Sequence, residues 1–385
     1  MMQTSEHSGG HMRRPDAASQ SGYSLIEMMV AVGVTTAIMG ATMSGLNDVS
    51  KGSETVLQMT QMNGMLHIGM DLIQRDMLQV GSGLPPGHVI LVPSGAGAVQ
   101  LRLPGPPGTS FLSVAGDPDI SAINPNPAAG PTINGHATDV LTVLMADNTF
   151  LDEPVKAMSS TSVDLPANDA YGNAIVIGSG PDRVTVGQLM MVYRGSTTTL
   201  LQVTAIDTAN RRLTFAAGDP MRLNQPAAAA GNLAAVSASL PALATAAPYN
   251  TYITRVRMIT YYLDNTTDPK HPRLVRRVNA GNPTSWDNNS GTAVAMDVED
   301  LEFRFDINDG ATNPANIQMN SADIGGTGAC SPNACNTNQI RKVDIILATR
   351  SSNAVNPSAR VYRNVLHSQV SFRGMSFVDE YLSSF

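Results

Sequence analysis

A long apolar stretch near the N-terminus constrains this chain more than any other feature of its sequence. Residues 23–46 read YSLIEMMVAVGVTTAIMGATMSGL and contain a single charged side chain, that of Glu27. At 1.5 Å per residue a helix of this length would extend about 36 Å, which exceeds the ~30 Å hydrocarbon core of a bilayer. The sequence therefore predicts a membrane-spanning helix over residues 23–46.

Positive charge precedes this stretch. Arg13 and Arg14 lie in the polar segment 1–22, and translation from Met12 in place of Met1 would leave a shorter leader that keeps both. Positive charge on this side predicts a cytoplasmic leader and an outward-facing C-terminal body. A secretory signal peptide would have an apolar region of about 7–15 residues followed by a small-residue cleavage site, which fits this stretch less well.

Glu27 is the informative residue within the stretch. A carboxylate in a spanning helix costs roughly 2.5–3.5 kcal/mol near the bilayer centre and less near an end. Cleavage after Gly22 would create an α-amine on Tyr23, four residues before Glu27. That amine could neutralise the Glu27 of a neighbouring subunit when helices bundle. The helix N-terminus also favours a nearby anion by about 0.3–1 kcal/mol.

The segment GYSLIEMMVA, residues 22–31, resembles the prepilin processing motif of type IV pilins and type II secretion pseudopilins. In that family a membrane-embedded aspartyl peptidase cuts after the glycine and methylates the new N-terminal residue, usually Phe. The glutamate at the fifth position past the cut serves assembly. The resemblance implies that Gly22 ends the leader, that Tyr23 is the methylated N-terminus, and that Glu27 is the assembly glutamate. Tyr23 departs from the usual Phe, so methylation is implied less firmly than cleavage.

Two patterns continue along the expected helix. Small residues recur every four positions, which lets membrane helices approach closely, although chance in an Ala/Gly-rich segment explains them equally well; they are Gly33, Ala37, Ala41 and Gly45. Residues 47–80 predict an amphipathic continuation whose apolar face packs beneath a globular domain. That face consists of Val56, Met59, Met62, Leu66, Met70, Ile73 and Met77.

The remainder of the chain has no long helical pattern. Short β-branched runs between turn signals predict strands, at residues 88–93, 139–144, 189–193, 200–206, 212–215, 252–263, 274–278, 298–305, 343–348 and 368–372. The block 186–215 is typical of a β-meander. An Ala/Pro-rich linker or long surface loop is expected at 225–248, between β-rich subdomains at 85–224 and 249–385. The predicted fold class is α+β: a long N-terminal helix, transmembrane then amphipathic, followed by a β-rich, pilin-like domain with room for two parts.

Composition excludes several function classes. The net charge is −7, which gives no general attraction to nucleic acid or anionic lipid. The local basic cluster of Arg273, Arg276 and Arg277 predicts a solvated or salt-bridged face before a DNA-contacting one, because aromatic residues that could stack on bases are scarce. The seven histidines are dispersed, and the sequence contains no HExxH, GxSxG or GxxxxGK[ST] motif. We therefore expect no enzymatic activity, cofactor, metal site or nucleic acid partner.

The chain contains two cysteines, Cys330 and Cys335, in the segment CSPNAC. Two thiols with no histidine at ligand spacing do not complete a structural zinc site. In an oxidising compartment the pair would close a small loop as a disulfide, whereas in a reducing compartment both would remain free thiols.

The second half resembles the PilW-type minor pilins and their J-type pseudopilin relatives. The matching segments are RMITYYL at 257–263, PRLVRR at 272–277, MDVEDLEFRF at 296–305, VDIILATR at 343–350 and VSFRGMSF at 370–377. The resemblance implies a structural minor pilin that is cut by prepilin peptidase and held in the inner membrane with a periplasmic C-terminal domain. It would then join other minor and major pilins through the inner-membrane assembly platform, in or at the tip of a cell-surface pilus. The alternatives are a J-type pseudopilin of a type II secretion system, and a tip adhesin or DNA-uptake binding subunit.

Overall fold

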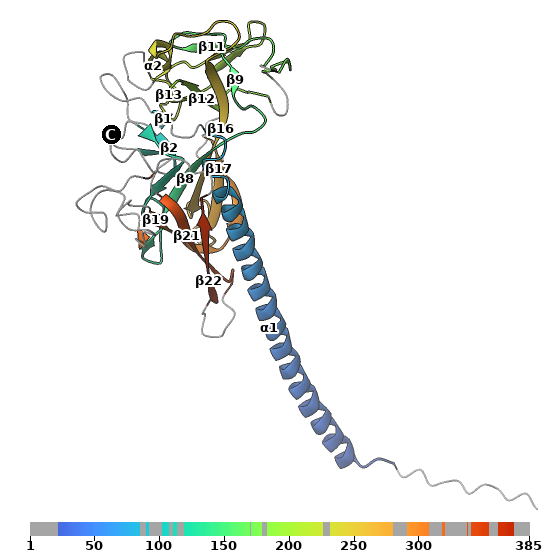
Figure 1. The fold of residues 1–385 in the computed structure, drawn as a ribbon. Helices are drawn as coiled ribbons and strands as arrows, with labels where there is room; N and C mark the ends of the chain where they lie inside the picture. Colours follow the sequence, from blue (N-terminus) through green and yellow to red (C-terminus); the bar gives the residue numbers. More distant parts are fainter. Residues whose placement is uncertain are drawn as a thin grey trace, which may run out of the picture. The chain divides into compact units, whose positions relative to one another are not determined.

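The computed structural model describes residues 22–84, 90–91, 102–107, 111–113, 119–169, 171–178, 183–225, 232–279, 291–307, 318–319, 337, 340–353 and 361–372. They belong to two compact units, one ending at Val56 and one beginning at Leu57. Helix α1, Leu25–Met77, starts in the first unit and ends in the second. Every other helix and strand lies in the second unit, which is rich in antiparallel sheet (Figure 1). A long N-terminal apolar helix followed by a β-rich domain is the predicted α+β class.

The largest sheet in the second unit has ten strands. Its members are β1 (Ile90–Leu91), β4 (Asp119–Ile120), β5 (Ile123–Asn126), β8 (Val140–Ala146), β9 (Glu153–Pro154), β12 (Leu189–Arg194), β13 (Thr197–Gln202), β16 (Thr251–Asp264), β17 (Arg273–Val278) and β18 (Thr292–Met296). All pairings in it are antiparallel except that of β1 with β13. Strand β16 is the longest, and it pairs with β8, β9, β12 and β17.

The other described strands of the unit form two four-stranded sheets and two hairpins. One sheet has the order β10 (Ala157–Met158), β11 (Ser162–Asp164), β15 (Arg212–Thr214), β14 (Ala205–Asp207). The other has the order β20 (Gln318–Met319), β19 (Val298–Ile307), β21 (Ile340–Arg350), β22 (Arg363–Ser371). The hairpins pair β2 (Arg102–Pro104) with β3 (Phe111–Ser113), and β6 (Thr132–Ile133) with β7 (His136–Ala137). Each of the ten runs predicted from the sequence overlaps a strand.

The expected β-meander over 186–215 is wrong. Strands β12 and β13 form a hairpin in the ten-stranded sheet, whereas β14 and β15 belong to the sheet that contains β11. The physical reason is burial: Val192 and Leu201 of the first hairpin share a core with Leu213 of the second. The chain therefore folds the second hairpin over the first, and both bury their apolar faces in one core.

The Ala/Pro-rich segment 225–248 contains a short helix, α2 (Leu233–Ala238), whose Leu233 and Val236 are buried. Arg194 of β12, only 1% exposed, donates to the Val236 carbonyl, to the Ser237 carbonyl at 2.6 Å and to the Ser239 carbonyl at 2.8 Å. These bonds satisfy the carbonyls at the end of α2, which the helix leaves without partners. The described part of the segment is thus fixed to the sheet, and β16 beyond it pairs with β8 and β12 before it.

The second half of α1 packs on the sheets, as its apolar face predicts. The first buried residue of α1 is the polar Gln58, and the buried apolar face runs from Met62 through Leu66, Met70, Ile73 and Met77, whereas Val56 is exposed. Gly69 lies at the closest approach: a Cβ on it would lie 3.2 Å from the Cδ2 atoms of Leu274 and Leu347, and 3.4 Å from Ala295 Cβ. Because Gly69 has no Cβ, α1 can pack closely against β17, β18 and β21.

One residue joins the two sheets that α1 covers. Only Asp297 separates β18 from β19, and its φ of 59° is in the left-handed region that most residues avoid. The chain turns there from the edge of the ten-stranded sheet into the sheet of β19, β21 and β22. The carbonyl of Asp297 accepts the Arg350 N–H at 2.9 Å, and the Val298 N–H donates to the Pro272 carbonyl at 2.9 Å.

Candidate functional site

Helix α1 begins with a hydrogen-bonded cap built from Ser24 and Glu27. The Ser24 hydroxyl accepts the Ile26 N–H at 3.3 Å, and a Glu27 carboxylate oxygen accepts the Ser24 N–H at 3.1 Å. A serine followed three residues later by glutamate is a capping box, in which each side chain bonds backbone at the helix start. The sequence analysis missed this role, although the spacing S-x-x-E at 24–27 signals it.

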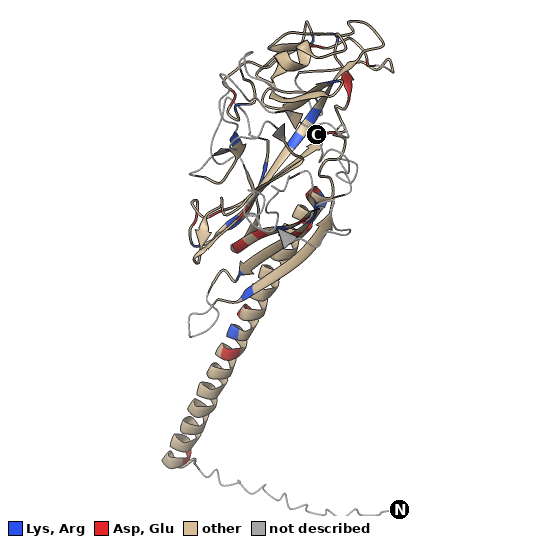
Figure 2. Ribbon diagram, turned by 60° about the vertical axis from the view of Figure 1, so that its left-hand side comes forward, with Lys and Arg blue, Asp and Glu red and all other residues tan. Residues whose placement is uncertain are grey.

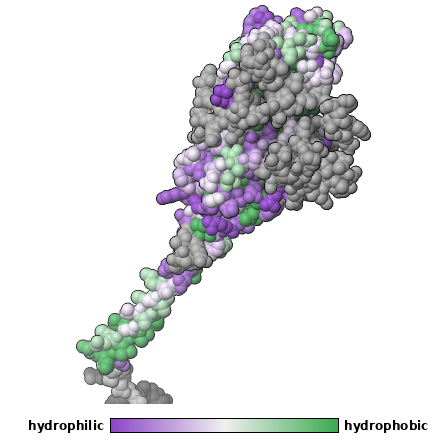
Figure 3. All heavy atoms as spheres, turned by 90° about the vertical axis from the view of Figure 1, so that its left-hand side faces the viewer, coloured by the Kyte–Doolittle hydropathy of each residue, from purple (hydrophilic) through white to green (hydrophobic). Residues whose placement is uncertain are grey.

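In its described residues the first unit consists of the first part of α1 and the three residues before it, and none of these side chains belongs to a core cluster. Its large apolar residues are exposed; they include Leu25, Ile26, Met28, Met29, Val30, Val32, Val34, Ile38, Met39, Met43 and Leu46. Figure 2 shows almost no charge, and Figure 3 shows hydrophobic colouring, at this end of α1. Among the described residues, α1 is the one helix long and apolar enough to cross a membrane.

Threonine hydroxyls within this helix are bonded internally. Thr35 donates to the Ala31 carbonyl at 2.7 Å, Thr36 to the Val32 carbonyl at 2.7 Å, and Thr42 to the Ile38 carbonyl at 2.8 Å. Since lipid offers no hydrogen-bond partners, polar groups in a spanning helix must be satisfied from within the protein. These hydroxyls meet that requirement.

The structure places the predicted processing residues at the start of α1. Gly22 and Tyr23 precede the helix, Tyr23 is 88% exposed, and Glu27 lies in the first turn. The small residues Gly33, Ala37, Ala41 and Gly45 all lie in α1 and are exposed. Arg13 and Arg14 of the leader, and the cysteines Cys330 and Cys335, lie outside the described residues.

The arginine cluster of β17 is salt-bridged, as the sequence favoured. Arg273 donates to Asp264 at 2.7 Å, and Arg276 donates to Asp76 at 2.6 Å. Arg277 is only 1% exposed. With two guanidinium groups paired to carboxylates and the third buried, the cluster offers no cationic patch for a phosphate backbone.

Asp76, in the last turn of α1, connects the helix to the sheet. One oxygen of its carboxylate accepts the Tyr261 hydroxyl at 2.5 Å and the Arg276 Nε at 2.6 Å, and Asp76 is 3% exposed. Burial, together with the adjacent Asp76 carboxylate, raises the pKa of Tyr261, so this phenol stays a donor. A carboxylate near a helix C-terminus is disfavoured by the macrodipole, and Arg276 offsets that cost.

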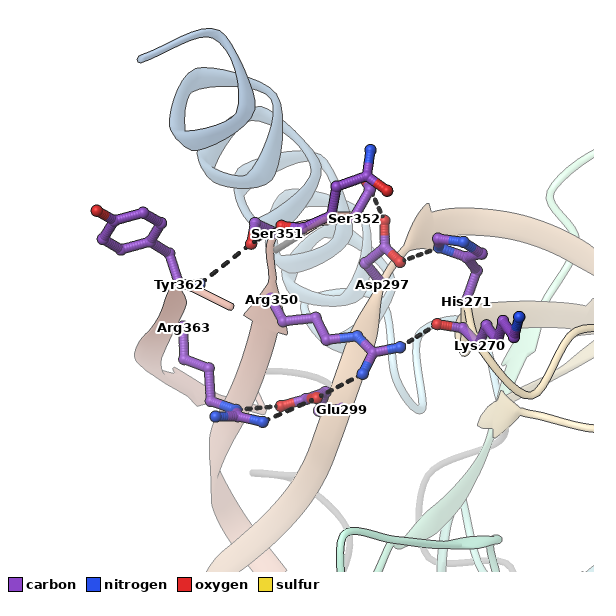
Figure 4. A network of polar contacts seen from close by, with 10 residues as sticks. Lys270, His271, Asp297, Glu299, Arg350, Ser351, Ser352, Tyr362 and Arg363 are labelled. Atoms are coloured by element: carbon purple, nitrogen blue, oxygen red, sulfur yellow. Dashed lines mark hydrogen bonds and ion pairs between the residues drawn. The ribbon is translucent and has the colours of Figure 1, made fainter. Parts of the chain in front are cut away.

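A second polar network surrounds the junction at Asp297 (Figure 4). His271 Nδ1 lies 2.6 Å from one oxygen of Asp297, and the Ser352 hydroxyl donates to the other at 2.6 Å. Because the serine bonds the carboxylate and not the imidazole, this is not the arrangement of a hydrolase triad, in which histidine takes the serine proton. The contacts fix the turn between β18 and β19. The family resemblance had included Asp297, in the segment 296–305. No sequence motif predicted that Asp297 would bond His271 and Ser352.

Glu299 extends this network across three strands. Its carboxylate accepts Arg363 Nε at 2.6 Å and Arg350 Nη1 at 3.2 Å. Burial alone would raise the pKa of Glu299, but hydrogen bonds from Arg363 and Asn134, with the charge of Arg350, lower it overall. The carboxylate therefore stays ionised and holds β19, β21 and the start of β22 together.

The described residues include no group of three or more His, Cys, Asp or Glu side chains that could hold a metal ion. A small cavity of about 230 Å³ lies beside the end of β16. Its lining combines prolines and a turn, namely Pro106, Pro107, Ala129, Gly130, Pro131, Leu263, Asp264, Asn265 and Thr266. The carboxylate on its wall, Asp264, already accepts bonds from Thr266, Thr267 and Arg273.

Asp264 should make the stability of the β-rich unit sensitive to acid. Burial alone would raise its pKa, but the bonds from Thr266, Thr267 and Arg273 lower the pKa to about 2. A folded pKa below the unfolded value of about 3.9 stabilises the fold above pH ~4, and this contribution is lost as pH falls toward 2. Urea denaturation of the full chain in detergent should show wild type losing more stability than Asp264→Asn between pH ~4.5 and ~2.5. Parallel pH profiles would contradict this assignment.

No family model, curated protein or solved structure matches this chain.

Proposed function

We propose that this chain is a structural minor pilin of a type IV pilus, or the equivalent J-type pseudopilin of a type II secretion filament. It is made as a precursor, anchored by α1 in the inner membrane with its β-rich domain in the periplasm, and then assembled through α1. Prepilin peptidase, the other pilins and the inner-membrane assembly platform are the partners that this role requires. Catalysis plays no part in it.

The proposal rests on the surroundings of Glu27. This carboxylate lies in the first turn of an exposed apolar helix, and its one described bond is to the Ser24 N–H. In the described residues of the first unit the single cationic side chain is Lys51, twenty-four residues further along α1. At 1.5 Å per residue the two are about 36 Å apart, too far to pair. A neighbouring chain that begins at Tyr23 would supply the missing cation as its α-ammonium group.

Each proposed site residue then has a role. Gly22 ends the leader, and Tyr23 becomes the methylated N-terminus. Glu27 pairs with the neighbour's amine, and the small residues at 33, 37, 41 and 45 let the helices approach. The salt-bridged arginines of β17 do not favour a DNA-uptake role.

Mass spectrometry of the mature protein tests the proposal. Protein extracted from the membranes of its native host should begin at Tyr23, with the added mass of one methyl group on its α-amine. Gly22→Val should abolish cleavage and leave the full precursor, because the peptidase would no longer meet the glycine before its cut. Gly33→Ala, a glycine change within the same helix, should be cut normally. A mature N-terminus at any other residue, or normal cutting of Gly22→Val, would remove the proposal.

A further inference from the structure

Asparagine is followed directly by glycine at two places in this chain, Asn63 with Gly64 and Asn134 with Gly135. Such a pair can lose ammonia without an enzyme. The glycine nitrogen attacks the side-chain amide carbon of the asparagine, and glycine has no Cβ to hinder the approach. One pair lies inside a long helix and the other at the tip of a hairpin. The chain therefore offers a matched comparison for this reaction.

Asn134 and Gly135 form the two-residue turn between β6 and β7, which closes with the pair Ile133↔His136. Their φ angles are 52° and 86°, and a type I′ turn has positive φ at both central residues. Both residues are exposed, and apart from the chain neighbours no atom of the described residues lies within 4 Å of a Cβ built on Gly135. Within the described part of the chain nothing accepts the Gly135 N–H. Its nitrogen is therefore open to solvent base and free to attack.

Asn63 and Gly64 lie well inside α1. In an α-helix the N–H of each residue is directed to the carbonyl four residues before it, so the Gly64 nitrogen is occupied. Asn63 Oδ1 also accepts the Asn364 amide of β22 at 2.8 Å. Gly64 can attack only after the helix opens locally around it, whereas Gly135 needs no such opening.

The side chain of Asn134 belongs to the network of Glu299. Its amide donates to the Glu299 carboxylate, which also accepts Arg363 Nε at 2.6 Å and Arg350 Nη1 at 3.2 Å. The Glu299 side chain is only 7% exposed. Ring closure requires Asn134 to release this carboxylate, and the two guanidinium groups then still neutralise it. The release therefore costs one hydrogen bond at the surface and leaves no buried charge alone.

We propose that Asn134 is a site of spontaneous deamidation, and that its product weakens the Glu299 network. The Gly135 nitrogen gives its proton to solvent base and forms a bond to Asn134 Cγ. The bond from Cγ to the side-chain nitrogen breaks, and ammonia leaves with a proton from water. A second water opens the resulting succinimide ring, at one carbonyl to give aspartate and at the other to give isoaspartate. The net change converts an amide and water into a carboxylic acid and ammonia, with no oxidation or reduction.

The product acts on Glu299 in the opposite sense to the amide that it replaces. A carboxylate at position 134 has no hydrogen to donate, and it brings a second negative charge next to Glu299. Like charges at one site disfavour each other's ionised form. Repulsion thus replaces a favourable bond where β19, β21 and β22 are held together. Isoaspartate would in addition lengthen the main chain of a two-residue turn whose geometry is tightly specified.

Ageing of the purified full chain in detergent tests the site. In mildly alkaline buffer, peptide mass spectrometry should find Asn134 converted from amide to acid at least about tenfold faster than Asn63, because α1 must open before Gly64 can react. Chromatography should separate aspartate and isoaspartate forms of the peptide that contains position 134, since the ring opens at either carbonyl. Equal rates at the two asparagines, faster conversion of Asn63, or aspartate as the sole product would overturn the assignment.

Asn134→Asp tests the effect of the product. Asn and Asp both tolerate the left-handed region, so this substitution changes the charge and keeps the turn. The urea midpoint of the full chain should fall below that of wild type at neutral pH. Repulsion raises the pKa of the introduced carboxyl, so the deficit should disappear as pH falls below the unfolded value of about 3.9, where the protonated group can donate again.

Asn63→Asp is the matched control for this measurement. It keeps the oxygen that accepts the Asn364 amide and should leave the urea midpoint near the wild-type value. Equal midpoints for Asn134→Asp and Asn63→Asp at neutral pH would show that a charge at position 134 does not reach the Glu299 network. A deficit that persists in acid would also contradict the proposed repulsion. Neither result bears on cleavage after Gly22, so this inference and the pilin proposal stand or fall separately.

Discussion

Glu27→Gln is expected to insert into the membrane normally and to lose incorporation into filaments. Glutamine can still accept the Ser24 N–H, because it replaces glutamate in a capping box. The change therefore keeps the cap observed at 3.1 Å and removes the charge alone. If that charge pairs with a neighbour's α-ammonium in lipid, its loss should reduce the amount of subunit in sheared filaments at least about tenfold, the equivalent of ~1.4 kcal/mol.

Ser24→Ala is the matched control for this experiment. It removes the capping hydroxyl at a cost of about 1 kcal/mol to the helix start, and leaves Glu27 charged. Incorporation should remain near the wild-type level. Immunoblots of sheared filaments and of washed membranes would compare the two variants. If Glu27→Gln assembles fully while Ser24→Ala does not, Glu27 acts as a cap and not as an assembly charge.

Asp76→Ala is expected to lower the free energy of unfolding of the β-rich unit by about 3 kcal/mol. Removal of one partner from a buried ion pair costs about 3–5 kcal/mol, since it leaves the other charge uncompensated. The lower end applies because the Arg276 side chain keeps 23% of its surface exposed. Tyr261, fully buried, would also lose its acceptor. Chemical denaturation of the full chain in detergent, followed by tyrosine fluorescence, would measure the change.

Two variants make this measurement specific. Arg75→Ala alters the adjacent exposed position of α1 and should change stability by no more than ~0.5 kcal/mol. The double variant Asp76→Leu with Arg276→Met removes both charges, and should be more stable than Asp76→Ala because no buried charge is left alone. Equal stability of Asp76→Ala and Arg75→Ala would show that the carboxylate does not hold α1 to the sheet.

Periodicity predicted the elements of this fold well. The predicted apolar face of α1 is buried from Met62 onward, and each of the ten predicted runs overlaps a strand. Both predictions depend only on the local spacing of apolar residues along the sequence. The way strands combine into sheets was not predictable in the same way. Whether β14 and β15 extend the sheet of β12 or fold over it depends on which side chains share a core, and Leu213 meets Val192 only in three dimensions.

Polar contacts at long sequence separation were the least predictable features. Arg194 and the end of α2 are about forty residues apart, and Asp76 and Arg276 are two hundred apart. No spacing rule links such residues. The Ala/Pro-rich composition of 225–248 suggested a linker or a long surface loop, because low complexity usually indicates one or the other. In its described part the buried guanidinium of Arg194 on β12 bonds the end of α2. Composition does not reveal that contact.

The sequence singled out Gly22, Tyr23 and Glu27 as candidate site residues, because a lone acid in an apolar run is conspicuous. Their processing and assembly roles remain predictions. We did not predict that Glu27 also caps α1, although the capping box at residues 24–27 is part of the same segment. For the arginines of β17 the sequence favoured a solvated or salt-bridged face, and Asp264 and Asp76 pair with two of them. The sequence did not identify these two partners.

The way α1 lies on the sheets has a mechanical consequence. Gly69 contacts side chains of β17, β18 and β21, and the helix also bonds β22, so a pull along its axis is shared among four strands. The two bonds to β22 lie eleven residues apart on α1, from Asn63 to Asn364 and from Gln74 to Ser368, so β22 runs along the helix. A pull along the helix axis would therefore load both bonds together in shear and would not break them one after the other. Shear requires many bonds to fail at once. The domain is thus built to transmit tension from the helix without unravelling.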